Sequence, residues 1–292
     1  MNLFWQILFD GFIISSIYAV GVVGFSLIFG TAGVLNLSHG AFLVLSAIIS
    51  WFFISHFHLP LLAGMVVGVL ASIVVSYLLF VLLINPIDKS KKIPTTEKEI
   101  FILTATLLWS MIIEELLDYF FSSNPVVVPP FVKGVLHLFK MNITYNEILL
   151  SFASVLILII LWTFINKTKT GKVLLAASMS HDGLAISGIN IKKVYILLWG
   201  VYGVLTGLSG ALLASFLGAS SQSVPSLTGL AFSVVVLGGL GNITGSILAA
   251  FLIGYIQTMT AYLISPAYTS IPAYVILVLI LMFKPKGLFG RF

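Results

Sequence analysis

The sequence predicts an all-α fold: a polytopic transmembrane helical bundle of about eight or nine spans, including broken or re-entrant segments. The 292-residue chain is 60% hydrophobic and 8% charged, whereas soluble domains carry about 25% charged residues. Its apolar runs approach the roughly 20 residues that a membrane-spanning helix requires. Its positive charges gather in a few segments between those runs. These observations exclude soluble enzymes, nucleic-acid binders and disordered modules.

The apolar runs predict one transmembrane domain over residues 1–292. The first stretch lacks the positive segment and cleavage site of a signal peptide, so we expect a retained span. The junction of the first two runs and the end of the seventh are rich in glycine. Broken or re-entrant helices fit there, because non-helical backbone survives at membrane depth only inside protein or beside a cavity. The runs cover 7–30, 33–54, 60–84, 100–121, 147–166, 194–218, 227–240, 246–265 and 271–283.

The positive charges predict the orientation. Twelve of the 14 lysine and arginine residues lie in three segments, 89–98, 167–193 and 284–291, that can share one side of the membrane. The longest loop of the other side carries only Lys133 and Lys140. Because basic loops remain in the cytoplasm, we expect the three segments and the C-terminus inside, and the N-terminus outside. Orientation thus explains the net charge of +5 without an acidic partner.

Two patterns indicate a packed bundle. Small residues recur every four positions along the run 194–218, which predicts close approach of another helix. Residues 33–40 and 239–245 also resemble each other, each with a central asparagine; duplicated halves are common in transporters, and chance explains this echo equally well. The small residues are Gly203, Gly207, Ala211 and Ser215, and the two asparagines are Asn36 and Asn242.

The first polar cluster is Asn36, Ser38 and His39, flanked by glycines. Polar groups in a membrane segment predict a functional role, here at a helix break that faces a translocation path. The alternative is a polar cap that fixes a turn near the cytoplasmic surface. No second histidine or carboxylate lies at ligand spacing from His39, so we expect no metal site.

The second cluster lies in the run 100–121, where Glu114 falls roughly 21 Å from the inner end. Glu114 and Asp118 share one helical face, and Glu115 points elsewhere. Two carboxylates on one face could serve a proton-coupled carrier. The alternative is that the helix ends early and the acids lie at the outer interface.

No catalytic constellation is evident. Thr170-Gly171-Lys172 lacks the upstream glycine and following hydroxyl of a phosphate-binding loop, so we expect no cofactor in this chain. Ser38 and His39 form a poor nucleophile–base pair for an intramembrane hydrolase, because adjacent helical residues point in different directions. Energy from ATP would have to enter through another chain.

The cytoplasmic loop 167–193 contains a segment, 174–187, that can form a helix closed by Gly188. Such a helix can dock into the groove of a partner protein. The alternative is an ordinary surface helix between two spans. The face expected to pack on the partner comprises Leu174, Ala177, His181 and Leu184.

Together these segments resemble the membrane-spanning permease of branched-chain amino-acid ABC importers, a group that also includes urea-type and ribose-type permeases. The similarity covers nearly the whole chain. Three motifs in this order carry it: Gly33-Val-Leu-Asn36-Leu-Ser38-His39-Gly40, Ala176-Ala177-Ser178-Met179-Ser180-His181-Asp182-x-x-Ala185-x-x-Gly188-Ile189 and Leu237-Gly238-Gly239-Leu240-Gly241-Asn242-Ile243-x-Gly245-Ser246.

The resemblance implies a multi-pass importer subunit of the plasma or inner membrane. Its partners would be a second homologous permease, two ATP-binding subunits that hold ATP and Mg²⁺, and an extracytoplasmic substrate-binding protein. The middle motif would be the coupling helix. The chain departs from the family where Gly183-Leu184 replaces a frequent Ala-Ala, and a Gln is common in the family near Glu114. The resemblance implies a translocation pathway at Asn36, Ser38, His39, Glu114 and Asn242, and coupling through Ala177, Ser178, His181, Asp182, Leu184 and Gly188.

Three transport functions remain open on the sequence. The first is a branched-chain amino-acid importer subunit. The second is a permease of the same group for urea or a sugar. The third is a proton-coupled secondary carrier that uses Glu114 and Asp118, and it differs from the others because it needs no ATPase.

Overall fold

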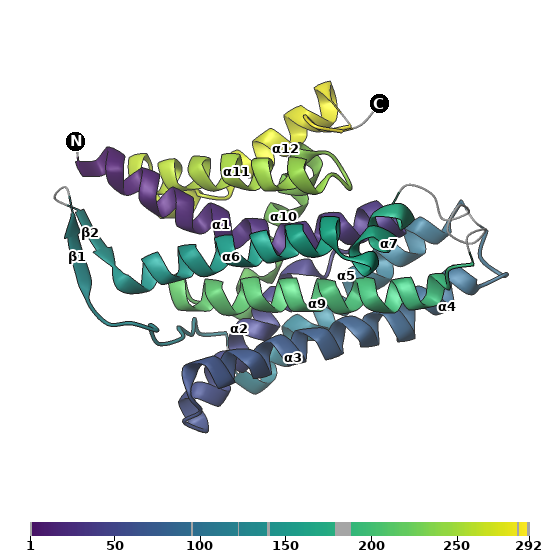
Figure 1. Ribbon diagram of the computed structural model, residues 1–292, viewed down its shortest axis with the longest axis horizontal. Helices are drawn as coiled ribbons and strands as arrows, with labels where there is room; N and C mark the ends of the chain where they lie inside the picture. Colours follow the sequence, from purple (N-terminus) through teal and green to yellow (C-terminus); the bar gives the residue numbers. More distant parts are fainter. Residues whose placement is uncertain are drawn as a thin grey trace.

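The computed structural model is a bundle of helices that run along the long axis of the molecule (Figure 1). It describes residues 2–94, 96–121, 123–138, 141–178, 188–284 and 286–290. Within these ranges nine helices are long and apolar enough to cross a membrane, which confirms the predicted polytopic all-α fold. The elements are α1 (Asn2–Ala32), α2 (His39–His56), α3 (Leu61–Leu79), a π-helical turn (Phe80–Ile84), α4 (Asn85–Lys89), α5 (Lys98–Phe121), β1 (Val135–Leu138), β2 (Met141–Thr144), α6 (Tyr145–Lys167), α7 (Lys169–Ala177), α9 (Ile191–Phe216), a 3-10 turn (Ser221–Ser223), α10 (Val224–Gly238), α11 (Ile243–Leu263), a 3-10 turn (Pro266–Tyr268) and α12 (Ile271–Phe283).

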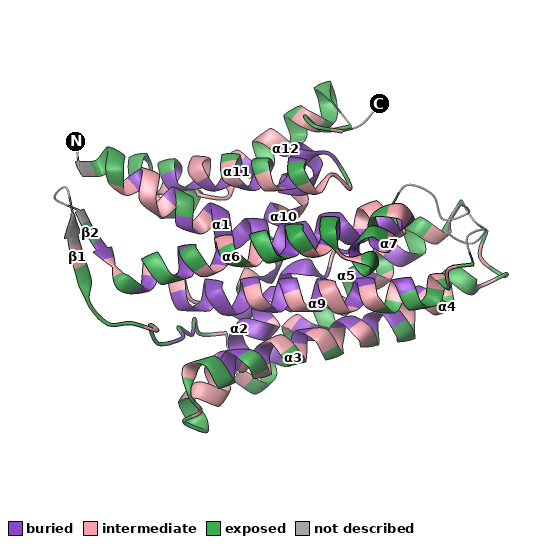
Figure 2. Cartoon of the chain, viewed as in Figure 1, coloured by how far each residue is buried: buried purple, intermediate pink, exposed green. Residues whose placement is uncertain are grey.

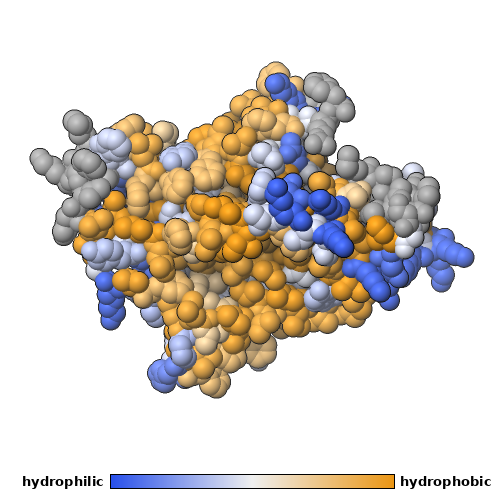
Figure 3. Space-filling view, viewed as in Figure 1, coloured by the Kyte–Doolittle hydropathy of each residue, from blue (hydrophilic) through white to orange (hydrophobic). Residues whose placement is uncertain are grey.

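The basic segments lie at one end of the bundle. Figure 1 shows α4, α7 and the C-terminus at the right, and the N-terminus with the β1–β2 hairpin at the left. The space-filling view shows strongly hydrophilic residues gathered mainly at the right end, whereas the flanks are apolar (Figure 3). The arrangement agrees with the predicted sharing of one membrane side by the basic segments.

The burial pattern separates central helices from peripheral ones. Helices α1, α2, α9 and α10 carry most of the buried side chains, whereas α12 is exposed along most of its length (Figure 2). Exposed leucine, isoleucine and phenylalanine side chains on α3, α5, α6 and α12 form an apolar outer surface. Such a surface suits lipid, whose tails are equally apolar, and it also suits packing against partner helices.

The predicted small-residue stripe is a close helix contact. A Cβ atom on Gly203 would lie 2.7 Å from Cα of Ile73, and one on Gly207 would lie 2.9 Å from Cα of Val69. Helix α3 adds a hydrogen bond from Oγ of Ser76 to the carbonyl of Trp199, at 3.0 Å. The glycines therefore let the backbones of α3 and α9 meet, as small residues do between membrane helices.

Two connections hold the ends of the bundle. At the N-terminal end, a strand hairpin absent from our prediction pairs β1 with β2, and a capping box of Thr144 and Glu147 starts α6. At the basic end, the C-terminal segment 286–290 folds back under α10, where the backbone N–H of Leu288 donates to the carbonyl of Leu237 at 2.8 Å.

Candidate functional site

The predicted break between the first two spans is present and buried. Helix α1 ends at Ala32, Gly33 adopts a positive φ of +66°, and α2 begins at His39. Glycine accepts this left-handed conformation without the strain that a Cβ introduces. The side chains of Asn36, Ser38 and His39 are each 0% exposed.

The broken segment reaches membrane depth. The backbone N–H of Leu37 donates to Oγ1 of Thr106 at 3.1 Å, and Thr106 lies about 12 Å from the start of α5 at about 1.5 Å per residue. Tyr202, which also contacts the segment, lies about 17 Å from the start of α9 by the same arithmetic. The apolar core of a bilayer is about 30 Å thick, so the segment enters from the basic end and stops near the middle of the spans.

Side chains from three other helices hold this segment. Nδ2 of Asn36 donates to the hydroxyl of Tyr202 at 2.9 Å, and Nδ1 of His39 lies 3.2 Å from the same hydroxyl. Oδ1 of Asn36 accepts from the backbone N–H of Ser38 at 3.1 Å and from its hydroxyl at 2.5 Å. The backbone N–H of Gly40 donates to Oγ1 of Thr228 at 3.0 Å. The break is therefore a hydrogen-bonded polar layer inside the bundle.

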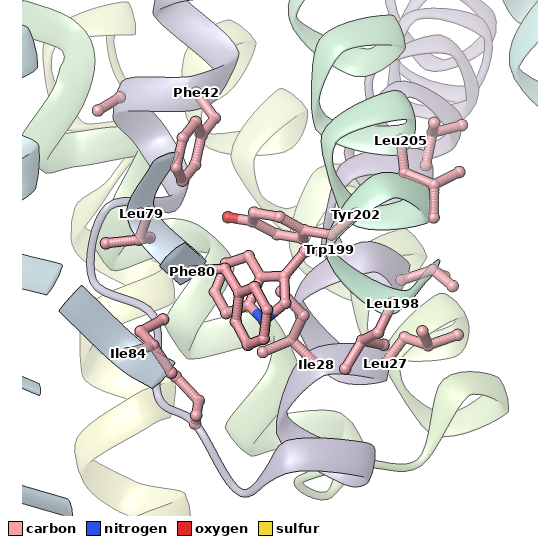
Figure 4. Packing of buried hydrophobic residues seen from close by; sticks show 14 of the residues in the cluster. Leu27, Ile28, Phe42, Leu79, Phe80, Ile84, Leu198, Trp199, Tyr202 and Leu205 are labelled. Atoms are coloured by element: carbon pink, nitrogen blue, oxygen red, sulfur yellow. The ribbon is translucent and has the colours of Figure 1, made fainter. Parts of the chain in front are cut away.

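Aromatic rings enclose the polar layer. The ring of Phe25 stacks on the imidazole of His39 with centroids 5.2 Å apart. Figure 4 shows Tyr202 between Phe42 and Trp199, and the ring centroids of Trp199 and Tyr202 are 5.6 Å apart. Within the described residues, Nε2 of His39 is buried without a hydrogen-bond partner. Aromatic rings therefore enclose the layer, and Nε2 of His39 is its one side-chain nitrogen without a hydrogen-bond partner among the described residues.

The acidic cluster lies away from this layer. Glu114 is half-buried and stands about 12 Å beyond Thr106 along α5. Glu115 and Asp118 are exposed, and Oδ1 of Asp118 accepts a hydrogen bond from Ser221 at 2.8 Å. Helix α5 continues to Phe121, so the alternative in which the helix ends before the acids is wrong. The pathway role of Glu114 stays a prediction.

Asn242 does not join the polar layer either. Its side chain caps α11 by accepting from the N–H of Gly245 at 3.1 Å, and its Nδ2 donates to the carbonyl of Phe289 at 2.6 Å. The turn before it meets α1, because a Cβ on Gly30 would lie 3.0 Å from Cα of Gly241. Asn242 therefore stabilises the basic end in this structure, and its place on the pathway stays a prediction.

The helix of the predicted coupling segment begins five residues earlier than expected. Helix α7 begins at Lys169 rather than at residue 174, because Oγ1 of Thr168 accepts from the N–H of Gly171 at 2.9 Å and caps the helix. His181, Asp182 and Leu184 lie outside the described residues. Gly188 has a φ of +73°, a conformation that glycine adopts without strain, and the predicted end of the helix there stays a prediction.

The expected docking face requires a correction. Leu174 and Ala177 are each 2% exposed and pack in the chain's own core with α6 and α9 residues such as Ile165 and Leu198. The helix is amphipathic, and its apolar side covers the bundle rather than a partner. Lys172 and Leu175 are the exposed residues of its second half, and the residue that follows it, Ser178, is exposed as well. The coupling role of the segment stays a prediction.

Sequence reasoning missed Tyr202 and Thr106, since a hydroxyl within an apolar run carries no distinguishing signal. It also missed a cavity of about 590 Å³ at the N-terminal end, which is lined by Asp10 and Gln257. A signal for Asp10 was available, because a carboxylate inside a predicted span is itself a functional indication.

Comparisons with known proteins agree on one family. Residues 7–281 match the family described as branched-chain amino acid transport system, permease component. The high-affinity branched-chain amino acid permease protein LivH of Escherichia coli is 22% identical over 99% of this chain and 96% of its own length. The high-affinity branched-chain amino acid permease protein BraD of Pseudomonas aeruginosa is 24% identical over 98% of this chain and 95% of its own length. The fructose import permease FrcC of Rhizobium meliloti is 23% identical over 83% of this chain and 68% of its own length. No solved structure matches the chain significantly.

Proposed function

Because the chain belongs to the branched-chain amino acid transport permease family, we propose that it is the membrane-spanning subunit of an ATP-driven importer for small polar solutes, chiefly branched-chain amino acids. It would act with a second homologous permease, two ATP-binding subunits and an extracytoplasmic binding protein. ATP and Mg²⁺ would be held by the ATP-binding subunits. The permease itself would bind no cofactor.

The family match across residues 7–281 carries this proposal. The two full-length relatives named above are branched-chain amino acid permeases, whereas the fructose permease is matched over a smaller share of its length. This difference favours an amino acid over a sugar as the transported solute. A sugar permease remains the second candidate, since the fructose permease still covers most of this chain.

The shape of the molecule supports coupling at the basic end. That end collects α4, α7 and the C-terminal segment, and the positive-inside rule assigns it to the cytoplasm, where ATP is found. Helix α7 presents Lys172, Leu175 and Ser178 outward while its other face is anchored in the bundle. A force on α7 from an ATPase would reach α6 and α9 directly, because Leu174 and Ala177 pack in the same core.

The polar layer at Asn36, Ser38 and His39 would be the inner part of the path. It lies near mid-membrane and is closed by aromatic rings. A solute entering it would exchange its water for the hydrogen-bonding groups of a broken segment, an arrangement that transporters use at the membrane centre.

The test is reconstitution of the permease with its ATPase and binding-protein partners in liposomes. Leucine uptake should require ATP in the ATPase compartment and should persist when an ionophore collapses the proton gradient. Uptake without ATPase subunits that disappears with the ionophore would establish the proton-coupled carrier instead. Uptake of ribose, fructose or urea with no uptake of leucine would move the chain to another solute class.

A further inference from the structure

The cavity of about 590 Å³ lies among α1, α9, α10 and α11 at the end opposite the basic segments. Its volume is within the range of pockets that hold small molecules. Residues Asp10, Ile14 and Tyr18 line it at four-residue intervals on one face of α1. The cavity therefore extends about 12 Å along the helix, from the N-terminal third towards the middle of the bundle.

A carboxylate without a cationic partner marks the outer part of this cavity. Asp10 accepts hydrogen bonds from Nε2 of Gln6 at 3.2 and 3.3 Å and from the hydroxyl of Tyr262 at 2.5 Å. In the described part of the chain no lysine or arginine pairs with it. Glu147 adds a second negative charge near it. An uncompensated negative charge in a partly dehydrated cavity attracts a cation, since its field is weakly screened there.

Uncharged polar side chains line the inner part of the cavity. Gln257 is 4% exposed and lines the cavity. Tyr18 is 8% exposed and lines it as well. Because both residues line the cavity, their polar groups can reach a ligand that occupies it.

The remaining wall is apolar and includes Ile14, Leu227 and Leu230. We propose that this cavity is a binding site for a zwitterionic amine with an aliphatic side chain, whose ammonium lies at Asp10 and whose alkyl group lies on that wall. Tyr18 and Gln257 supply hydrogen-bond donors for its carboxylate. The inference rests on the proposed import of branched-chain amino acids and locates the solute on the extracytoplasmic side of the path.

The chain contains no cysteine, which permits a direct test on the full-length permease in liposomes. Thr258→Cys places a single thiol in the cavity wall, one helical turn from Tyr262, and Ser226→Cys places one on α10. We expect a cationic methanethiosulfonate to label either thiol at least about tenfold faster than an anionic one. Asp10→Asn should abolish this preference while it still accepts from Tyr262 and Gln6. Glu115→Gln, a matched change outside the cavity lining, should leave the preference unchanged.

Ligand protection then tests the solute class. Leucine and isoamylamine should slow labelling of Thr258→Cys, whereas 4-methylpentanoate, which lacks the ammonium, should not. Asp10→Asn should weaken protection by leucine roughly tenfold or more, the expected scale for a hydrogen bond to a charged group. Tyr262→Phe, which keeps the carboxylate, should retain the charge preference and so separates the charge from the local fold.

The outcomes separate the two proposals. Equal labelling by both reagents, or labelling by neither at both positions, would overturn the cavity site even if reconstituted importer takes up leucine. A cation preference that depends on Asp10 but shows no protection by leucine would refute the amino-acid ligand and count against the proposed solute. Equal protection by 4-methylpentanoate and leucine would also overturn the role of the ammonium.

Discussion

Nδ2 of Asn36 lies 2.9 Å from the hydroxyl of Tyr202, although the two residues are 166 positions apart in the chain. This hydrogen bond joins the broken segment after α1 to the middle of α9. Non-helical backbone is tolerated at membrane depth only when its polar groups are satisfied by the surrounding protein. The pair therefore fixes the broken segment inside the bundle.

Loss of this pair should impair transport more than membrane insertion. Asn36→Leu leaves the backbone N–H and the hydroxyl of Ser38 without their acceptor, at a cost of about 1–3 kcal/mol for each unsatisfied group. It also removes one of the two partners that the described residues give the Tyr202 hydroxyl. We expect solute uptake by reconstituted importer to fall at least about tenfold while the amount in the membrane changes little. Thr163→Val is the control, because Oγ1 of Thr163 bonds only to its own exposed helix. Full uptake by Asn36→Leu would reduce the segment to a structural turn.

The contact between α3 and α9 should tolerate no enlargement. Gly207→Val would place its side chain against Cα of Val69, where even a single Cβ comes within 2.9 Å. Since backbone cannot yield as a flexible side chain does, we expect a loss of about 2 kcal/mol or more and a lower melting temperature in detergent. Thr104→Val on the exposed side of α5 should change neither the stability nor the melting temperature. A Gly207→Val protein as stable as the parent would show that the helices can separate.

Amine labelling tests the orientation. An impermeant reagent added to intact cells should modify Lys133, which is exposed on the loop at the hairpin end. Lys169, Lys172 and Lys192 should react only after the membrane is opened, because they lie at the basic end. Labelling of Lys172 from outside would reverse the assignment of both ends.

Charge on the exposed side of α7 should disturb coupling. Leu175→Glu changes a side chain that is 43% exposed, so we expect the permease to fold and the ATPase to be lost on purification. Ala177→Glu buries a charge in the core and should instead destabilise the permease itself. Phe57→Glu, an exposed apolar residue at the far end of α2, is the control and should retain the ATPase. Retention with Leu175→Glu would place the docking surface elsewhere, and the region 85–99 is then the next candidate.

Some features of this fold could be read from local sequence. Long apolar runs predicted the spans, and the glycines around Asn36 predicted the helix break between α1 and α2. Both features depend on residues that are adjacent in the chain. The spacing of Gly203 and Gly207 predicted a close helix contact for the same reason. The identity of the opposing helix, α3, depends on packing and was not predictable.

Other features depend on contacts between distant segments. Nothing in the neighbourhood of Tyr202 marks it as the partner of Asn36, and nothing near Ala177 shows that its face is covered by α6 and α9. The start of α7 depends on Thr168, a capping residue that the periodicity of apolar residues does not reveal. Asp10 differs from these residues, since a carboxylate within the predicted run 7–30 is itself a local signal.

The fold-back of the C-terminal segment has a consequence for the order of folding. Residues 286–290 leave the ribosome after α10, α11 and α12, yet they supply the N–H of Leu288 to Leu237 and the carbonyl of Phe289 to Asn242. A chain folds from its N-terminal part during synthesis, so the turn between α10 and α11 must wait for these partners. The basic end can thus become rigid only after α12 has been translated. The contact of α1 with that turn, through Gly30 and Gly241, depends on the same late step.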